Sequence, residues 1–365
     1  MARTRHVAVL VGLVLLTLAC YAPHRGAAWV YEDANWLGTF STAPEGWKIP
    51  GRSLTMQTYH WTWQVAGLAP SLYRLGNLSL HLANGLLVYA IAATLIPGAA
   101  AVWSAGVFLL HPLNSEAASY VAARSDLLMT LWVLLAVWLA LGRSSVWRWG
   151  LVACALVAAG LSKETGLMAV PLLVITLLLW RPQIPIGVLA APLWIGVGIA
   201  FGVMWQPLLS WLTMSPHFGG TFFTWPEYVE LQIVAVWRLL ALLVWPDGFS
   251  IDHDVISLGP AWTRAAYSLT VLSIGLLIWG WRRAPLVAWP IAWVGLALLP
   301  RFLFRTNEFI NEHQLYLATA GLSIGAGAAI VGLWTWRPAW RVFPDAFLAD
   351  LRRQWAQSGL SRRMA

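Results

Sequence analysis

The sequence predicts an all-α membrane protein, a polytopic bundle of transmembrane helices. Of its 365 residues, 59% are hydrophobic and only 10% are charged, whereas a soluble domain carries about 25% charged residues. About ten or eleven apolar segments alternate with short polar ones, and the longer segments can cross a bilayer as helices. Many of the 26 tryptophans stand near the ends of these segments, as expected for side chains at the membrane interface.

The apolar segments define the expected helices in chain order. They lie near 6–23, 75–96, 98–112, 126–142, 150–162, 166–180, 185–205, 229–245, 265–280, 286–303 and 315–334. Arginines cluster at the N-terminus, at Arg143 and Arg148, at Arg181, at Arg282 and Arg283, and at Arg337 and Arg341. Because basic loops favour the cytoplasmic side, the segments expected outside are 28–74, 112–125, 163–165, 206–262 and 301–314.

The segment 229–245 is an exception to this alternation. A full crossing there would move every later basic loop to the outer side, against the positive-inside rule. We therefore expect 229–245 to be re-entrant or interfacial, within the external segment 206–262. Residues 1–336 then form one transmembrane domain and 337–365 a basic cytoplasmic tail, whose apolar spacing indicates an amphipathic helix on the membrane surface.

The sequence also excludes several classes of function. The net charge of +8 comes from arginines that punctuate apolar segments and form no continuous patch, so nucleic-acid binding is not indicated. No phosphate loop, dinucleotide fingerprint, metal-type histidine pair or nucleophile elbow occurs in the chain. No cofactor is therefore expected, and a divalent metal is not indicated.

An acidic pair, Glu32 and Asp33, follows the first apolar segment and opens the first external loop. Two adjacent carboxylates can divide acid–base work, since one takes a proton from a hydroxyl while the other orients its neighbours. The headgroup of a lipid-linked substrate would lie at this depth. An equally good explanation is that the two charges only keep the loop hydrated at the membrane interface.

A second polar set lies between 111 and 126 and contains His111, Glu116, Tyr120, Arg124 and Asp126. A helix over 115–124 would place Glu116, Tyr120 and Arg124 on one face. Arg124 would then face a phosphate and be held by a salt bridge from Glu116, and Asp126 would cap the next helix. A self-neutralising structural network accounts for the same residues.

Two further sets lie on the outer side. Lys163 and Glu164 occupy the short turn 163–165, where Lys163 can bind a lipid phosphate as a point charge or pair with Glu164. The other set precedes the last apolar segment and consists of Arg301, Arg305, Glu308, Glu312, His313 and Tyr316. Its two arginines run against the positive-inside trend, which favours anion binding.

Several ordered stretches carry a family resemblance over about residues 25–335. They are Tyr31-Glu32-Asp33, the stretch from Arg52 to Thr55 with the later His81, the stretch from His111 to Leu128, Ser162-Lys163-Glu164, the stretch from Trp245 to Asp252, and the stretch from Glu312 to Tyr316. Together they resemble the GT-C glycosyltransferases, which are polytopic enzymes that use polyprenyl-phosphate sugars. They are most similar to the membrane portion of the TMTC family of protein O-mannosyltransferases and its bacterial relatives, without the tetratricopeptide repeats.

The resemblance implies roles for these residues. Glu32 and Asp33 would be the catalytic pair, one of them as general base, and Arg124 and Lys163 would bind the donor phosphate. Arg301 and Arg305 are expected as further phosphate ligands from their position against the positive-inside trend alone. Supporting residues would be Arg52, His111, Glu116, Tyr120, Asp126, Glu164, Glu312 and Tyr316. The chain departs from the family at the Glu-Asp order, at Ala123 in place of glycine and at His313 in place of arginine, so the identity of the base stays open.

The predicted function is therefore the transfer of a mannose-like sugar from a polyprenyl phosphate to a hydroxyl of a protein or glycan acceptor, with inversion implied by the resemblance. One alternative is a carrier or flippase for lipid-linked sugars, which would use the same cations without a base. The other is a non-catalytic assembly subunit, which would need neither the cations nor a base. Lys48 and Lys163 are the only lysines. This arginine-rich composition suggests a bacterial inner membrane, with the active face toward the periplasm.

Overall fold

The computed structural model describes residues 2–30, 33, 52–96, 98–143, 145–181, 198, 224–250, 259–303 and 311–334. Over these residues the secondary structure consists of α-helices and short 3-10 helices, with no β-strand. Six helical segments in this part of the chain are long and apolar enough to cross a membrane: His6–Gly26, Pro70–Leu95, Val121–Leu141, Gly259–Arg283, Pro285–Leu303 and Glu312–Leu333. The prediction of an all-α polytopic bundle is therefore confirmed.

The helices follow the apolar segments closely. They are α1 (Ala2–Tyr21), α4 (Pro70–Leu95), α5 (Ala99–Leu110), α7 (Arg124–Leu141), α8 (Val146–Ser162), α9 (Ala169–Trp180), α11 (Trp225–Ala241), α12 (Gly259–Arg283), α13 (Pro285–Leu303) and α14 (Tyr316–Trp334). The expected span 185–205, apart from residue 198, and the tail 337–365 lie outside the described residues. Prolines open α4 and α13, where a missing N–H costs no helical hydrogen bond.

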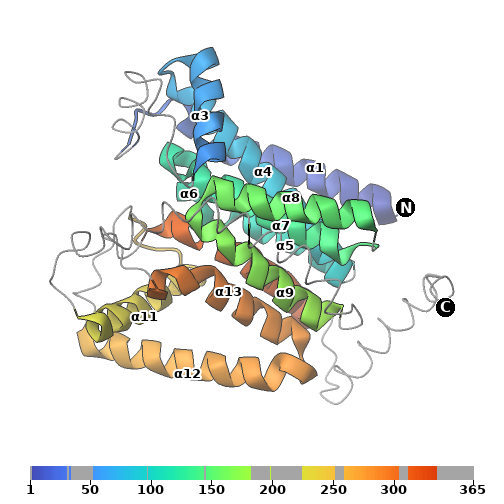
Figure 1. The fold of residues 1–365 in the computed structure, drawn as a ribbon, viewed down its shortest axis with the longest axis vertical. Coiled ribbons are helices and arrows are strands. Elements are labelled where there is room, and N and C mark those ends of the chain that lie inside the picture. Colours follow the sequence, from blue (N-terminus) through green and yellow to red (C-terminus); the bar gives the residue numbers. More distant parts are fainter. Residues whose placement is uncertain are drawn as a thin grey trace.

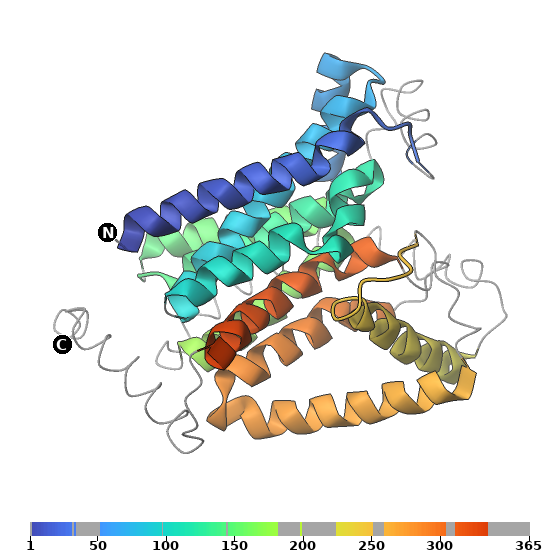
Figure 2. The ribbon, with the colours of Figure 1, turned by 180° about the vertical axis from the view of Figure 1, so that it is seen from behind.

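Short elements gather at one end of the bundle. They are α3 (Ser53–Ala66), α6 (Ser115–Ser119) and the 3-10 helices η1 (Ala22–Gly26), η3 (Pro112–Asn114), η4 (Val121–Ala123), η5 (Glu164–Met168) and η7 (Glu312–Leu315). We call this end, opposite the N-terminus of α1, the site end (Figures 1 and 2). The external segments predicted around 112–125, 163–165 and 301–314 thus meet at the same end.

The centre of the bundle is formed by α4, α5, α7 and α14, whereas α1 and α12 lie at its outside (Figure 1). The helices approach closely where α14 carries glycine. A Cβ on Gly321 would lie 2.4 Å from the ring of Trp293 in α13, and one on Gly327 would lie 2.5 Å from the carbonyl oxygen of Ala100 in α5. Small residues allow such contacts between membrane helices, and they fix the position of η7 at the start of α14.

The helix α3 was not expected, because 28–74 was assigned to a loop as a whole. Its residues are too polar for a membrane span, but Thr55, Met56 and Tyr59 form a buried stripe along one face. The hydroxyl of Thr55 donates to the carbonyl oxygen of Ser162 at 2.7 Å, and the hydroxyl of Tyr59 donates to that of Val121 at 2.6 Å. These bonds hold α3 across the site end of the bundle.

Both ends of α11 contact residues of the site end. The Tyr228 hydroxyl donates to the carbonyl oxygen of Arg301 at 3.2 Å, and His111 Nε2 lies 3.0 Å from the carbonyl oxygen of Leu243, just after the helix. A re-entrant segment would enter and leave at one end in this way. The exclusion of 229–245 from full crossing stays a prediction.

Candidate functional site

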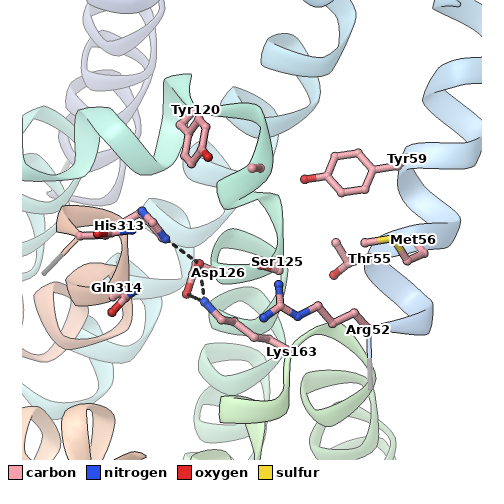
Figure 3. A pocket seen from close by; sticks show the side chains of 12 residues that line it. Arg52, Thr55, Met56, Tyr59, Tyr120, Ser125, Asp126, Lys163, His313 and Gln314 are labelled. Carbon is pink, nitrogen blue, oxygen red and sulfur yellow. Dashed lines mark hydrogen bonds and ion pairs between the residues drawn. The ribbon is translucent and has the colours of Figure 1, made fainter. Parts of the chain in front are cut away.

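A polar cavity of about 230 Å³ opens at the site end (Figure 3). Its lining comes from α3, from the start of α7, from the turn after α8 and from η7, which are far apart in the sequence. The lining residues are Arg52, Thr55, Met56, Tyr59, Tyr120, Ala122, Ser125, Asp126, Lys163, Asn311, His313 and Gln314. The lining thus contains residues from three of the four polar sets. The fourth set is linked to the cavity by the hydrogen bond between the Ala122 backbone N–H and Asp33.

Lys163 and Asp126 form the central ion pair of this cavity. The ammonium nitrogen lies 2.7 Å from each carboxylate oxygen, and the two side chains are only 11% and 6% exposed. The expectation that Asp126 caps a helix is wrong. The helix α7 begins at Arg124 and has Ala123 at its N-cap, so Asp126 stands in the first turn, where it pairs with Lys163 instead.

Arg52 and Glu164 form a second ion pair at the rim. The Arg52 Nε and Nη2 atoms donate to the two carboxylate oxygens at 2.8 and 2.5 Å. A guanidinium and a carboxylate match each other in this two-bond geometry. Glu164 therefore faces α3 and does not pair with Lys163. Burial acts to raise the pKa of Glu164, but the charge and hydrogen bonds of Arg52, together with the charge of Lys163, outweigh it and lower that pKa to about 2.

The Arg52–Glu164 pair gives a prediction for stability. The side chains are 26% and 43% exposed, so water screens them and their coupling free energy is expected to be at most about 1 kcal/mol. This coupling should persist at pH 4, because the folded-state pKa lies below the ordinary value of 4.5. The stabilisation is present above that ordinary value and is lost only as the pH falls through about 2.

The measurement is a double-mutant cycle of Arg52→Gln and Glu164→Gln. Melting temperatures in detergent at pH 7 and pH 4 provide the coupling at each pH. A coupling that disappears between pH 7 and pH 4 would show that Glu164 titrates like an unpaired glutamate, and would contradict the geometry of the pair.

Asp33 is buried directly behind the cavity wall. It is 1% exposed; Oδ1 accepts from the Ala122 backbone N–H at 2.9 Å and Oδ2 from the Val30 N–H at 3.4 Å. Burial raises the pKa of Asp33, and the bonds from Ala122 and Val30 oppose part of that shift. Glu32 lies outside the described residues. The structure therefore locates one member of the acidic pair beside the cavity.

Arg74 holds the chain that leads to Asp33, and sequence reasoning missed it. Its guanidinium donates to the carbonyl oxygens of Ala27, of Ala28 at 2.6 Å and of Ser119 at 3.2 Å. The side chain is 5% exposed although it stands at the start of a membrane helix. An arginine beside an apolar span is a functional signal, but its carbonyl partners are visible only in the fold.

The structure does not place Arg124 where it was expected. Residues 115–124 do not form one helix, because α6 ends at Ser119 and α7 begins at Arg124. The carboxylate of Glu116 consequently bonds to His313 and not to Arg124. The expected salt bridge and the shared face are therefore wrong.

The Arg124 guanidinium is instead buried between α3 and α4. It is 2% exposed and lies over the Tyr59 ring, 4.5 Å from its centroid. Its bonds go to Asn77 Oδ1 at 2.9 Å, the Tyr73 carbonyl at 2.9 Å, the Thr62 hydroxyl at 3.0 Å and the Thr58 carbonyl at 3.3 Å. A guanidinium engaged in this way positions α3 and does not line the cavity.

His313 lines the cavity wall opposite α3 and is paired with Glu116 behind it. One carboxylate oxygen lies 2.9 Å from His313 Nδ1 and the other accepts from the His313 backbone N–H at 2.8 Å. His313 Nε2 lies 4.0 Å from Asp126 Oδ2, and the Tyr120 ring stands beside the imidazole at a centroid distance of 5.8 Å. Glu116, Tyr120 and Asp126 are thereby brought to one place, although not along one helix.

Four other predicted residues lie outside the lining and bond elsewhere. His111 contacts the Leu243 carbonyl, Glu312 accepts from the Ser250 N–H at 2.9 Å, the Tyr316 hydroxyl lies 2.7 Å from His81 Nδ1, and Arg301 Nε donates to Gln232 Oε1 at 3.1 Å. Arg305 and Glu308 lie outside the described residues. Among the described residues, no group of three or more histidine, cysteine, aspartate or glutamate side chains could hold a metal ion.

A second cavity, of about 1100 Å³, is apolar and lies between α11, α12, α13 and α14. Its lining reaches from His111 and Leu243 at the site end to Leu286 in the first turn of α13, at the other end of the bundle. Only a few polar groups line it, among them Thr270 and Ser273 of α12. Such a space fits a long hydrocarbon chain.

The comparisons with known proteins support the resemblance over one stretch. Protein O-mannosyl-transferase Tmtc1 of Drosophila melanogaster is 34% identical to this chain over 123 residues. The match covers 32% of this chain and 14% of that relative. No family model matches the chain, and no solved structure matches it.

Proposed function

We propose that this protein is a membrane glycosyltransferase that moves a mannose-like sugar from a polyprenyl phosphate to an acceptor hydroxyl at the site end. The observation that carries the proposal is the polar cavity, in which Arg52 and Lys163 converge at the end of a transmembrane bundle. The similarity to a relative named as a protein O-mannosyl-transferase supports this reaction class. The large apolar cavity offers a place for the polyprenyl chain.

The donor phosphate is assigned to Lys163 and Arg52, and no longer to Arg124. An ammonium has three N–H donors and a guanidinium has five. Asp126 takes up two donors of Lys163 and Glu164 two donors of Arg52. Each cation therefore keeps donors for a phosphate, while its carboxylate partner fixes its position. Arg305 remains a proposed further ligand outside the described residues.

The chemistry then needs one base and one stabilised leaving group. A carboxylate of the Glu32–Asp33 pair takes the acceptor proton as the acceptor oxygen attacks the anomeric carbon. The bond between that carbon and the phosphate oxygen breaks, and the electron pair stays on the phosphate, which Lys163 and Arg52 stabilise. Attack opposite to the leaving phosphate inverts the anomeric configuration. The acceptor is a protein or glycan, and the active face lies outside the membrane, in a bacterium toward the periplasm.

Sugar transfer in liposomes that contain polyprenyl-phosphate mannose tests the proposal. The purified protein is expected to release mannose to water or to a simple alcohol. The double variant Lys163→Gln/Asp126→Asn removes both charges of the buried pair and is expected to raise the half-saturating donor concentration about 10- to 100-fold, the worth of one charge-assisted hydrogen bond. Arg25→Gln, which removes an exposed cation of η1, serves as the control.

The outcomes separate the candidates. Donor binding with no transfer under any condition would favour a carrier or an assembly subunit. If the double variant transfers sugar at an unchanged half-saturating donor concentration, the protein is still an enzyme, but Lys163 is not the phosphate ligand.

A further inference from the structure

We infer that Glu116 and His313 form a carboxylate–imidazole dyad in which His313 acts as the general acid for the departing donor phosphate. The inference rests on the proposed function and adds a second proton-transferring group to it. Sequence reasoning placed Glu116 beside Arg124, and it placed His313 in the last polar set and among the departures from a family pattern. The structure joins the two residues from positions almost 200 apart in the chain.

The orientation of the imidazole is fixed. Glu116 engages both the His313 backbone N–H and Nδ1, at 2.8 and 2.9 Å, and the Glu116 and His313 side chains are 8% and 10% exposed. An ionised carboxylate only accepts hydrogen bonds, so Nδ1 carries a proton. A carboxylate in this position sets the tautomer and the ring direction of a histidine.

The other ring nitrogen faces the cavity. His313 Nε2 is directed toward Asp126, whose Oδ2 lies 4.0 Å away (Figure 3). That distance is longer than a hydrogen bond, and within the described part of the chain no hydrogen bond engages Nε2. Asp126 also holds Lys163, so Nε2 stands next to the cation assigned to the donor phosphate.

The charged groups around the ring come from several elements. Glu116 of α6 lies on the Nδ1 side, and Asp126 of α7, with Lys163 attached to it, lies on the Nε2 side. Arg52 and the Tyr59 and Tyr120 hydroxyls complete the ionisable lining of the cavity. Glu312, on the same 3-10 helix, is turned away to the Ser250 N–H, and Arg301 of α13 bonds to Gln232.

The reaction balances with this assignment. The acceptor hydroxyl loses its proton to the acidic pair, the new bond forms between its oxygen and the anomeric carbon, and the carbon–phosphate oxygen bond breaks. The imidazolium transfers its Nε2 proton to that departing oxygen, which leaves as polyprenyl hydrogen phosphate. Water then returns a proton to Nε2 and accepts the proton held by the acidic pair, so both groups regain their starting protonation states.

A general acid must carry its proton when the phosphate leaves, so transfer is expected to decline as the pH rises. His313→Gln should lower the turnover rate about 100-fold at pH 6.5, at the low end for acid–base groups, because a phosphate is already a good leaving group. It should also remove the decline at higher pH.

Two further variants separate the acid from a mere cation. His313→Arg keeps a permanent charge but cannot release its proton, so donor affinity is expected to stay near that of the wild type while turnover remains low. Glu116→Gln keeps the shape and removes the charge that orients the ring, and it should lower turnover with little change in donor affinity. His24→Gln, which alters an exposed histidine of η1, is the matched control and should keep the wild-type profile.

The experiment measures single-turnover transfer from polyprenyl-phosphate mannose in liposomes from pH 5.5 to pH 9, with donor affinity and melting temperature for each variant. A wild-type pH profile in His313→Gln, or full turnover in His313→Arg, would overturn the inference while the proposed enzyme stands. A wild-type protein without transfer at any pH would overturn both.

Discussion

Glu32→Gln is expected to slow sugar transfer by about 10²- to 10⁴-fold, the range for loss of a general base. Asp33→Asn is expected to slow transfer by a similar factor and also to lower the melting temperature. The loss of stability follows from the bonds of Asp33, whose two carboxylate oxygens already accept from the Ala122 and Val30 N–H groups. An asparagine has one acceptor atom in place of two, so one of these bonds is lost.

These bonds indicate that Asp33 has a positioning role within the acidic pair. Asp33 ties the first external loop to the wall of the cavity through Ala122, and Arg74 holds the same loop through the carbonyls of Ala27 and Ala28. A buried carboxylate with a raised pKa suits proton transfer, but each oxygen of Asp33 already accepts a backbone N–H bond, and such bonds favour the ionised form over the protonated one. We therefore assign the base to Glu32 and the positioning of the loop to Asp33.

Transfer rates and melting temperatures of the two variants test this division. Asp247→Asn, which alters an exposed carboxylate after α11, is the matched control and should behave as the wild type. An inactive Asp33→Asn of normal stability beside an active Glu32→Gln would make Asp33 the base. Normal transfer by both variants would remove the pair from the chemistry, and intact transport by both without transfer would favour a carrier.

The helices were predictable because the membrane imposes a simple rule. A span must be long and apolar, and the segments near 75–96, 126–142 and 315–334 satisfy that rule in the sequence and form α4, α7 and α14 in the structure. The helix α3 does not meet that rule. Hydrogen bonds to Ser162 and Val121 hold this polar helix in place. Because these partners lie about 60 to 110 residues away in the sequence, no local pattern predicts the helix.

The candidate site was predictable in part for the same reason. Lys163 follows α8 and Asp126 opens α7, and two antiparallel neighbours bring these positions to one end. The partner of each charge was not predictable in this way. Spacing by four suggested that Glu116 meets Arg124, but the chain leaves the helix at Tyr120, and His313 arrives from the other end of the sequence. Pairing within a site depends on tertiary contacts, which residue spacing does not record.

Arg124→Gln is expected to destabilise the protein by about 3 kcal/mol or more, and not primarily to weaken donor binding. The Arg124 guanidinium bonds to the Asn77 side chain and to the Tyr73 and Thr58 carbonyls, and it is buried almost completely. Each buried acceptor left without a donor costs about 1–3 kcal/mol. A glutamine replaces only part of these bonds and leaves the space over the Tyr59 ring empty.

Arg124→Lys is not expected to rescue the stability, because an ammonium cannot reproduce the planar fork of a guanidinium. Arg264→Gln, which alters an exposed arginine of α12, should melt like the wild type. The measurement is thermal unfolding in detergent together with the affinity for polyprenyl-phosphate mannose. A variant at Arg124 with normal stability and weak donor binding would restore the role that residue spacing suggested, since only a guanidinium free to meet a phosphate could be removed without cost to the fold.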